Sequence, residues 1–351
     1  MPLTQVLVAE PCAEKRQYRG GNRAKPKTKI GRILVTWREA QGLTRADILR
    51  KVRIKISEAQ LRRIETKKVS RADIPLLFEI ARVLGMLPEE REVLVSLLNV
   101  REVRQVDPDY VSRVKRSAQR WAEHTRLPAF VADDMSDLLV VNRLMLRLLQ
   151  KFGYSDLVDE WPKHYPYNLT LYLFSPKIDF ARMVKDEEEW ANILKQNLRF
   201  FRYVSLPYHD ECYWHGLINM LLKHPDGYVG GRFYDAWLRL QREEQEYELP
   251  QRWPRFNRMY RYVLPNGQTI TVSSMVTPEP TQYGMLYFST YHPADAVTAR
   301  FFAELAEEVE RTGGPYVFTL AQWPLTNKLK DGRMPSEYLK PCRFPPLTNG
   351  G

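Results

Sequence analysis

Between residues 29 and 100, apolar residues recur at the spacing of an α-helix in five successive runs, most of which are bounded by capping residues. Gly42 follows the first run, at a position where the chain needs a left-handed residue. Thr44 and Ser57 precede the second and third runs, where an N-cap side chain is needed. The pattern therefore predicts an all-α domain of five short helices over residues 29–100. The fourth and fifth helices are expected in ADIPLLFEIARVLGM (72–86) and PEEREVLVSLLN (88–99).

The positive charge of the chain is concentrated in its first fifth. The formal net charge is +11, yet residues 1–71 hold 19 Lys and Arg against six Asp and Glu, a net of +13. The remaining residues hold 34 against 36, a net of −2. A basic segment joined to a nearly neutral remainder indicates a polyanionic partner for that segment alone. Residues 1–28 are polar and basic, and they are expected to form a flexible arm.

The third run, ISEAQLRRIETKK at residues 56–68, has two contrasting sides. Apolar side chains such as Leu61 and Ile64 fall on one side of the helix, and charged or polar side chains fall on the other. The polar side is either an ordinary solvated surface or a surface that contacts a negatively charged backbone. The charge distribution favours the second interpretation.

Length, composition and cysteine content narrow the class of protein. The chain has 351 residues, of which 44% are hydrophobic, so it is long enough for two or three domains with real cores. Cys12, Cys212 and Cys342 are few and far apart, which argues against a disulfide framework and for the cytoplasm. No signal peptide is visible. Arg143 and Arg147 interrupt the most apolar stretch, so we expect no membrane span.

The rest of the chain predicts an α+β domain. Residues 101–128 indicate a connecting helix that starts at Asp107-Pro108. Short strands are expected in AFVA and LLVV, a hairpin in MYRYVLPNGQTITVSSMV, and a further strand in GMLYFSTYH. The segment between about residues 180 and 250 is helical in pattern. Residues 129–295 should therefore form one domain with a small antiparallel sheet and flanking helices. The segment 296–351 should be an amphipathic helix followed by an extended, Pro-rich tail.

The first domain resembles the helix-turn-helix domain of XRE-family regulators. The resemblance rests on IGRILVTWREAQGLT, QLRRIE and LLFEIARVLGM, and covers about 60 residues. In such domains the third helix enters the major groove and its first residues contact base edges. The linker KVRIKIS before that helix is about two residues longer than the usual turn. The resemblance implies base contacts or positioning by Ser57, Glu58, Ala59, Gln60, Arg62 and Arg63, and phosphate contacts by Arg45, Lys67 and Lys68.

The second domain resembles the MmyB-like ligand-binding domain, which is PAS-like in fold. The resemblance spans roughly residues 105–295. It rests on LPAFVADDMSDLLVVN, NLTLYLF, EEEWANILKQNLR, FYDAW and MLYFSTYHPADA. It implies a transcription regulator that responds to a small amphipathic effector such as a fatty acid, with no other cofactor. Regulators of this kind commonly bind double-stranded DNA operators as homodimers.

An apolar effector site would contain many aromatic side chains and a few polar anchors. Arg199, His215 and Arg232 are candidate anchors for a carboxylate, whereas Asn142, Tyr172 and Tyr287 could offer hydrogen bonds. Burial of an acyl chain would contribute about 0.8 kcal/mol per methylene. The remaining candidate lining residues are Trp190, Tyr203, Trp214, Phe233 and Trp237.

Two other functions are compatible with parts of the sequence. The stretch HDECYWH places His209, Cys212 and His215 at a spacing that could bind zinc, as in a metal-dependent hydrolase with a DNA-binding front end. No second pair of ligands lies nearby, and there is no nucleophile elbow, HExxH or phosphate loop, so we do not expect an enzyme. A constitutive dimeric repressor without any ligand is the third possibility.

Overall fold

The computed structural model describes residues 5–7, 26–67, 69–99, 101–103, 105–153, 165–174, 184, 187–223, 227–246, 258–330 and 332–342. The chain divides into two compact units. Unit 1 comprises Met1–Glu102, Arg202–Trp253 and Pro335–Gly351, and unit 2 comprises Val103–Phe201 and Pro254–Met334. This division differs from the predicted one, because residues 202–253 belong with the N-terminal helices.

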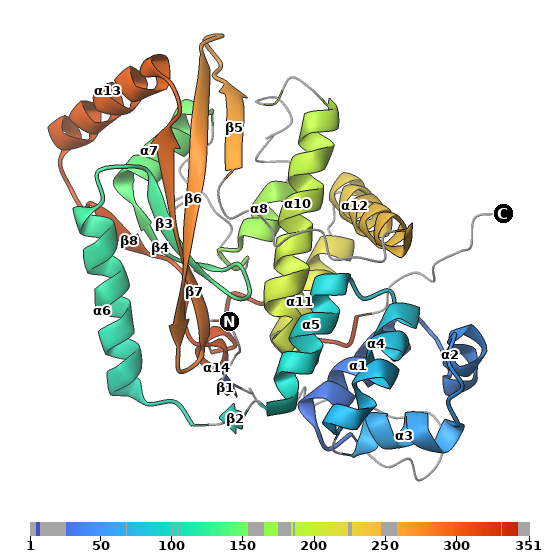
Figure 1. The fold of residues 1–351 in the computed structure, drawn as a ribbon. Coiled ribbons are helices and arrows are strands. Elements are labelled where there is room, and N and C mark those ends of the chain that lie inside the picture. Colours follow the sequence, from blue (N-terminus) through green and yellow to red (C-terminus); the bar gives the residue numbers. More distant parts are fainter. Residues whose placement is uncertain are drawn as a thin grey trace. The chain divides into compact units, whose positions relative to one another are not determined.

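The first hundred residues contain the five helices that the periodicity predicts (Figure 1). The side chains of Thr44 and Ser57 accept hydrogen bonds from the backbone N–H of Asp47 and Gln60, and both form complete capping boxes. Gly42 has a φ of +69°, and the N–H of Leu43 closes the end of the first helix on the Arg38 carbonyl at 2.9 Å. The elements are α1 (Lys29–Ala40), α2 (Arg45–Lys51), α3 (Glu58–Thr66), η1 (Arg71–Asp73), α4 (Ile74–Val83), α5 (Pro88–Ser96) and η2 (Leu97–Asn99).

Helices α1 and α3 approach each other closely at one glycine. A Cβ atom on Gly31 would lie 2.2 Å from the carbonyl oxygen of Glu65, so no other residue fits there without movement of the backbone. Apolar side chains of α2, α3 and α4, including Ile48, Leu61 and Leu77, are also buried. The contact therefore fixes the position of α3 against α1.

Helix α1 is buried on nearly all sides, which the amphipathic sequence pattern does not predict. The indole Nε1 of Trp37 donates a hydrogen bond of 2.9 Å to Nδ1 of His209, and Lys29 forms ion pairs with Asp210 at 2.6 Å and Glu211 at 2.8 Å. These contacts explain why the segment after residue 202 belongs to unit 1. Its elements are η3 (Leu206–Tyr208), α11 (Cys212–Leu222), α12 (Gly227–Glu246) and η4 (Ser336–Tyr338).

A second buried connection within unit 1 joins Glu90 of α5 to Arg202. The Arg202 guanidinium pairs with Glu90 at 2.7 Å, and both side chains are completely buried. The same guanidinium lies 5.1 Å from the Trp37 ring centroid and 4.4 Å from that of Trp237. Of the predicted N-terminal arm, the described part contains a short strand, β1 (Gln5–Leu7), which pairs with β2 (Arg101–Val103).

Unit 2 contains a mixed α+β arrangement built on a six-stranded antiparallel sheet, in the order β5-β6-β7-β3-β4-β8 (Figure 1). Gly267, with a φ of +83°, lies in the turn of the predicted hairpin, and the N–H of Leu264 donates to the Gln268 carbonyl across it at 2.8 Å. The strands are β3 (Ala129–Asp133), β4 (Leu138–Asn142), β5 (Arg258–Val263), β6 (Thr269–Thr281), β7 (Gly284–Pro293) and β8 (Val317–Thr319).

Helices cover both faces of this sheet. The predicted connecting helix, α6 (Pro108–His124), packs on one face, where Trp121 makes an edge-to-face contact with Phe288 at 5.0 Å between ring centroids. On the other face lie α7 (Arg143–Lys151), α8 (Leu169–Phe174) and the unit 2 part of α10 (Glu187–Ser205). The predicted amphipathic helix, α13 (Ala296–Thr312), packs on α7 and β6.

The tail beyond residue 325 is not simply extended. It begins with the short helix α14 (Leu325–Lys328), and Lys328 is buried between Asp133 and Asp137 in the turn that joins β3 to β4. The predicted Pro-rich end from residue 343 lies outside the described residues. No helix in the described ranges combines the length and the apolar character needed to cross a membrane.

Candidate functional site

The outward side of α3 is the most accessible predicted site in unit 1. Its inward residues, including Leu61 and Ile64, are buried, whereas Ser57, Glu58, Ala59, Gln60, Arg62 and Lys67 are exposed. The Gln60 side chain also accepts a 2.9 Å hydrogen bond from the Ser57 N–H as part of the cap. The first turn of α3 therefore presents short and polar side chains to solvent.

Two of the predicted DNA-contacting arginines, Arg45 and Arg63, also have structural partners within unit 1. Arg45 forms an ion pair of 2.6 Å with Glu65, a buried carboxylate that Arg38 also contacts at 2.7 Å. Arg63 donates two hydrogen bonds to Asp73, one of them 3.0 Å long. The Arg63 hydrogen bonds hold the pKa of Asp73 well below its usual range. The exposed guanidinium at this pair of positions therefore belongs to Arg62. Lys68 lies outside the described residues.

The loop before α3 contributes cations that sequence reasoning missed. Residues 52–57 connect α2 to α3, and the loop and the end of α2 expose several basic side chains close in sequence to the first turn of α3. Their charge is visible in the sequence, but the longer linker left their position relative to α3 undetermined by sequence alone. These exposed side chains are Arg50, Lys51, Arg53 and Lys55.

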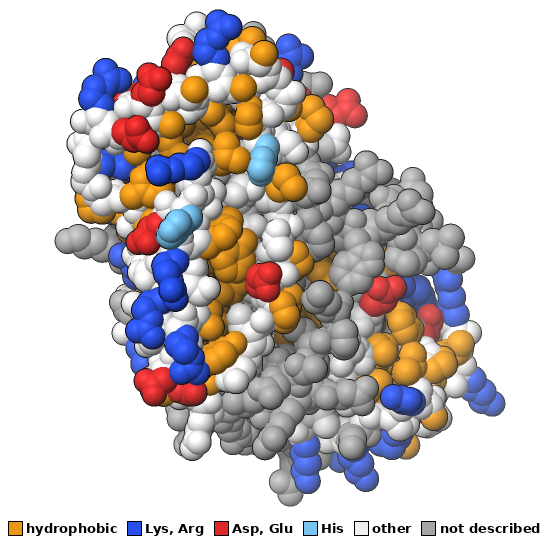
Figure 2. All heavy atoms as spheres, turned by 60° about the vertical axis from the view of Figure 1, so that its left-hand side comes forward, with side chains coloured by type: hydrophobic (Ala, Val, Ile, Leu, Met, Phe, Trp, Pro, Cys, Tyr) orange, Lys and Arg blue, Asp and Glu red, His pale blue; other side chains and the backbone are white. Residues whose placement is uncertain are grey.

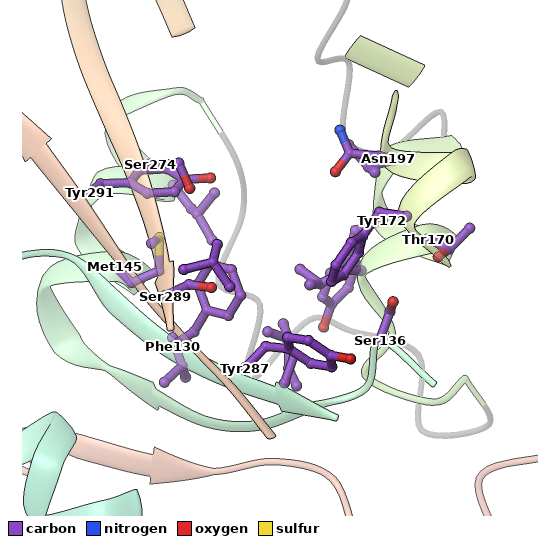
Figure 3. A pocket seen from close by; sticks show the side chains of 18 of the residues that line it. Phe130, Ser136, Met145, Thr170, Tyr172, Asn197, Ser274, Tyr287, Ser289 and Tyr291 are labelled. Carbon is purple, nitrogen blue, oxygen red and sulfur yellow. The ribbon is translucent and has the colours of Figure 1, made fainter. Parts of the chain in front are cut away.

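Unit 2 contains a partly open cavity of about 190 Å³ between the sheet and its covering helices (Figure 3). Engineered apolar cavities of about 150 Å³ bind a benzene-sized molecule, so this hollow is large enough for at least one aromatic ring. In Figure 3, Phe130 and Met145 lie on one wall and Tyr172 and Asn197 face them from the other. The aromatic lining residues are Phe130, Tyr172, Trp190, Phe200, Tyr260, Tyr262, Tyr287 and Tyr291.

Three of the predicted ligand residues, Tyr172, Trp190 and Tyr287, line this cavity. Asn142 instead caps α7, where its Oδ1 accepts from the N–H of Met145 at 3.0 Å and of Ala129 at 3.0 Å. Arg199 is buried in α10 but does not line the cavity. The other predicted ligand residues lie in unit 1, and none of them lines this cavity: Tyr203, Trp214, His215, Arg232, Phe233 and Trp237.

Alternation along β5, β6 and β7 accounts for five of the lining residues that the sequence did not predict. Tyr260 and Tyr262 on β5, Ser274 on β6, and Ser289 and Tyr291 on β7 all point to the same side of the sheet. Period-two alternation was visible in these segments. However, the sequence pattern did not show which side of the sheet faces a cavity.

Among the described lining residues, Asp133 is the one charged side chain. It forms an ion pair of 2.5 Å with Lys328, which also contacts Asp137. Burial, opposed by Lys328, raises the pKa of Asp133 to about 6. The adjacent Asp134 accepts a hydrogen bond of 3.1 Å from the Tyr287 hydroxyl, which fixes the orientation of that ring.

The HDECYWH stretch has structural partners within unit 1. His209 Nδ1 accepts from Trp37, so its Nε2 carries the hydrogen and faces Ser205 Oγ at 3.1 Å. Burial lowers the pKa of His209 well below its usual value, which keeps the ring neutral. His215 Nδ1 accepts from the N–H of Cys342 at 3.3 Å. The part of the chain that the structure describes contains no group of three His, Cys, Asp or Glu side chains placed to hold a metal ion.

The structure corrects one expectation about the cysteines. Cys212 is disulfide-bonded, whereas the number and spacing of the cysteines argued against a disulfide framework. Cys342 is a buried thiol whose Sγ lies 3.2 Å from His215 Nδ1.

Unit 2 also exposes apolar side chains. Figure 2 shows hydrophobic side chains on the face of unit 2 that comes forward in this view. Met259 on β5 is 68% exposed and Met275 on β6 is 43% exposed, and Val297 at the start of α13 is also exposed. Because Met259 and Met275 alternate with cavity residues along β5 and β6, they lie on the opposite side of the sheet.

No protein-family model matches the chain, and no curated protein sequence is significantly similar to it.

Proposed function

We propose that this chain is a sequence-specific DNA-binding transcription regulator whose unit 2 binds a small, largely apolar effector. The observation that carries the proposal is the exposed first turn of α3, the third of five short helices. Its side chains are of the kinds that contact bases, and basic side chains surround it in sequence.

In this proposal, α3 enters the major groove. Gln60 is suited to adenine and Arg62 to guanine, while Lys67 and the cations of residues 50–55 contact phosphates. Ser57 and Ala59 are small enough to let the helix approach the base edges closely. Arg45 and Arg63 hold α3 in position through Glu65 and Asp73 and have no direct role in base contacts.

Operator selection from a random DNA library with the full chain, followed by titration of the selected duplex, tests this proposal. Arg62→Ala should weaken binding by about 1–3 kcal/mol and relax the preference at one base position. Lys55→Ala and Lys67→Ala should each lower the slope of log affinity against log salt by about 1. Arg300→Ala, which removes an exposed cation from α13 in unit 2, is the charge-matched control. Equal effects of Arg62→Ala and Arg300→Ala would contradict the role of α3.

The cavity in unit 2 supports an effector-binding role over a constitutive repressor with a filled core. An effector changes DNA affinity only if it binds one of two arrangements of the protein more tightly.

The proposal includes a homodimer, because a pair of α3 helices would recognise two half-sites. The exposed Met259, Met275 and Val297 are suited to a contact with a second copy. Light scattering after size-exclusion chromatography should give twice the monomer mass, and Met259→Lys with Met275→Lys should shift it toward the monomer. A monomeric wild-type protein at operator-binding concentrations would contradict the dimer.

A further inference from the structure

Two buried serines point into the cavity of unit 2. Ser289 is 2% exposed and Ser274 is 8% exposed, and both lie on the wall formed by the sheet (Figure 3). Within the described part of the chain, neither side-chain hydroxyl has a hydrogen-bond partner. Both serines line the cavity, so their hydroxyls are available to donate hydrogen bonds to a polar atom bound there.

The register of the sheet places the two hydroxyls near each other. Ser274 on β6 is opposite Tyr291 on β7, and Ser289 is opposite Val276. Ser274 and Ser289 are therefore diagonal neighbours on one face, separated by roughly 7–8 Å at the backbone. A single carbonyl or hydroxyl oxygen of a bound molecule could lie between them.

The described lining offers no cation to a carboxylate. Asp133 is already paired with Lys328, and the remaining polar groups are neutral hydroxyls and the Asn197 amide. Burial raises the pKa values of the Tyr172 and Tyr291 phenols, so both remain neutral. An anionic head group would lose its hydration in this cavity and gain no opposite charge from the described lining residues.

The walls favour a ring over an extended chain. Phe130 and Tyr291 meet edge to face with their centroids 6.4 Å apart, and Phe200 and Tyr287 do so at 5.2 Å. These rings come from the sheet and from α10, so aromatic faces and edges surround the hollow.

We propose that the cavity binds an uncharged, ring-containing molecule whose carbonyl or hydroxyl oxygen accepts hydrogen bonds from Ser274 and Ser289. This inference rests on the proposed effector role of unit 2, and it replaces the fatty acid that the sequence resemblance implied with a different chemical class.

Three matched single-ring probes test the inference in ligand-observed NMR titrations of the full chain at neutral pH: acetophenone, benzoate and ethylbenzene. Acetophenone should bind at least about tenfold more tightly than benzoate. Ser274→Ala with Ser289→Ala should weaken acetophenone binding about threefold to tenfold, and leave ethylbenzene binding unchanged. Ser273→Ala, on the opposite side of β6, is the control and should change neither.

The outcomes separate the two proposals. If ethylbenzene binds but benzoate equals or exceeds acetophenone, the cavity is a ligand site and the inference of an uncharged ligand is wrong. If the double serine variant leaves acetophenone affinity unchanged, the assignment to Ser274 and Ser289 is wrong. If none of the three probes binds, the effector role of the cavity fails, and this inference fails with it.

Discussion

Arg63 on α3 donates two hydrogen bonds to the carboxylate of Asp73, whereas the adjacent Arg62 is exposed. Asp73 is buried, and it also accepts a hydrogen bond of 2.9 Å from the Ser70 N–H, so the pair holds the turn after α3 in place. Two arginines that are equivalent in the sequence thus have different environments. We expect their substitutions to affect different properties.

Arg63→Ala should lower the free energy of unfolding by about 1–2 kcal/mol. It leaves the buried Asp73 carboxylate with fewer partners, and the partial exposure of Arg63 limits the loss. Arg62→Ala should leave stability within about 0.5 kcal/mol and weaken DNA binding. Urea denaturation and operator titration of both variants check this. If Arg62→Ala lost stability and Arg63→Ala did not, the structural role would belong to Arg62 and not to Arg63.

Gly31→Ala should destabilise the protein by about 1–3 kcal/mol, because the new methyl group would meet the Glu65 carbonyl 2.2 Å away. Gly231 in α12 provides the matched control, since nothing lies within 4 Å of a Cβ built there. Gly231→Ala should stabilise by about 0.5–1 kcal/mol through the helix preference of alanine. Thermal unfolding of the two variants measures the difference between their stabilities. Equal effects of the two substitutions would show that α1 and α3 are not in close contact.

The α1–α5 segment should not fold stably without residues 202–246. A fragment of residues 26–102 would expose Trp37, Lys29 and Glu90, which have buried partners in the full chain. We expect broad, weakly cooperative thermal unfolding by circular dichroism for the fragment and a sharp transition for the full chain. A fragment as stable as the full chain would show that the 202–246 segment is dispensable.

Breaking one of these connections within the full chain gives an independent measure. Glu90→Gln should cost about 3–5 kcal/mol, because the buried Arg202 guanidinium loses its counter-charge. Glu90→Gln combined with Arg202→Met should recover part of this loss, since no unpaired charge remains. Urea titrations of the single and double variants give both values.

Asp133 should make stability depend on pH in a defined window. Its pKa is raised to about 6 in the folded chain, so the folded state binds its proton more tightly than the unfolded state does. The protonation of Asp133 therefore stabilises the folded state most at about pH 4 and below. This stabilisation, of up to about 3 kcal/mol, is lost as the pH rises from about 4 to about 6. The stability of wild type minus that of Asp133→Asn, measured by urea denaturation, should grow over this interval on acidification. A difference that is constant between about pH 4 and 7 would contradict the shift.

Local features of this protein were predictable because neighbouring residues decide them. The five N-terminal helices follow from apolar periodicity and from caps at Thr44, Ser57 and Gly42. The β5–β6 hairpin follows from alternation around Pro265-Asn266-Gly267, and α13 begins and ends where its pattern does.

Tertiary structure alone decided which distant residues meet. The burial of α1 on nearly all sides depends on Arg202 and His209, which contact Trp37 from more than 160 positions away in the chain. No local pattern encodes these contacts. The same holds for the partners of Arg45 and Arg63. It also holds for the cavity, because strand alternation sorts Ser274 and Ser289 to one side, while only the packing of α7, α8 and α10 against the sheet decides that this side encloses a hollow.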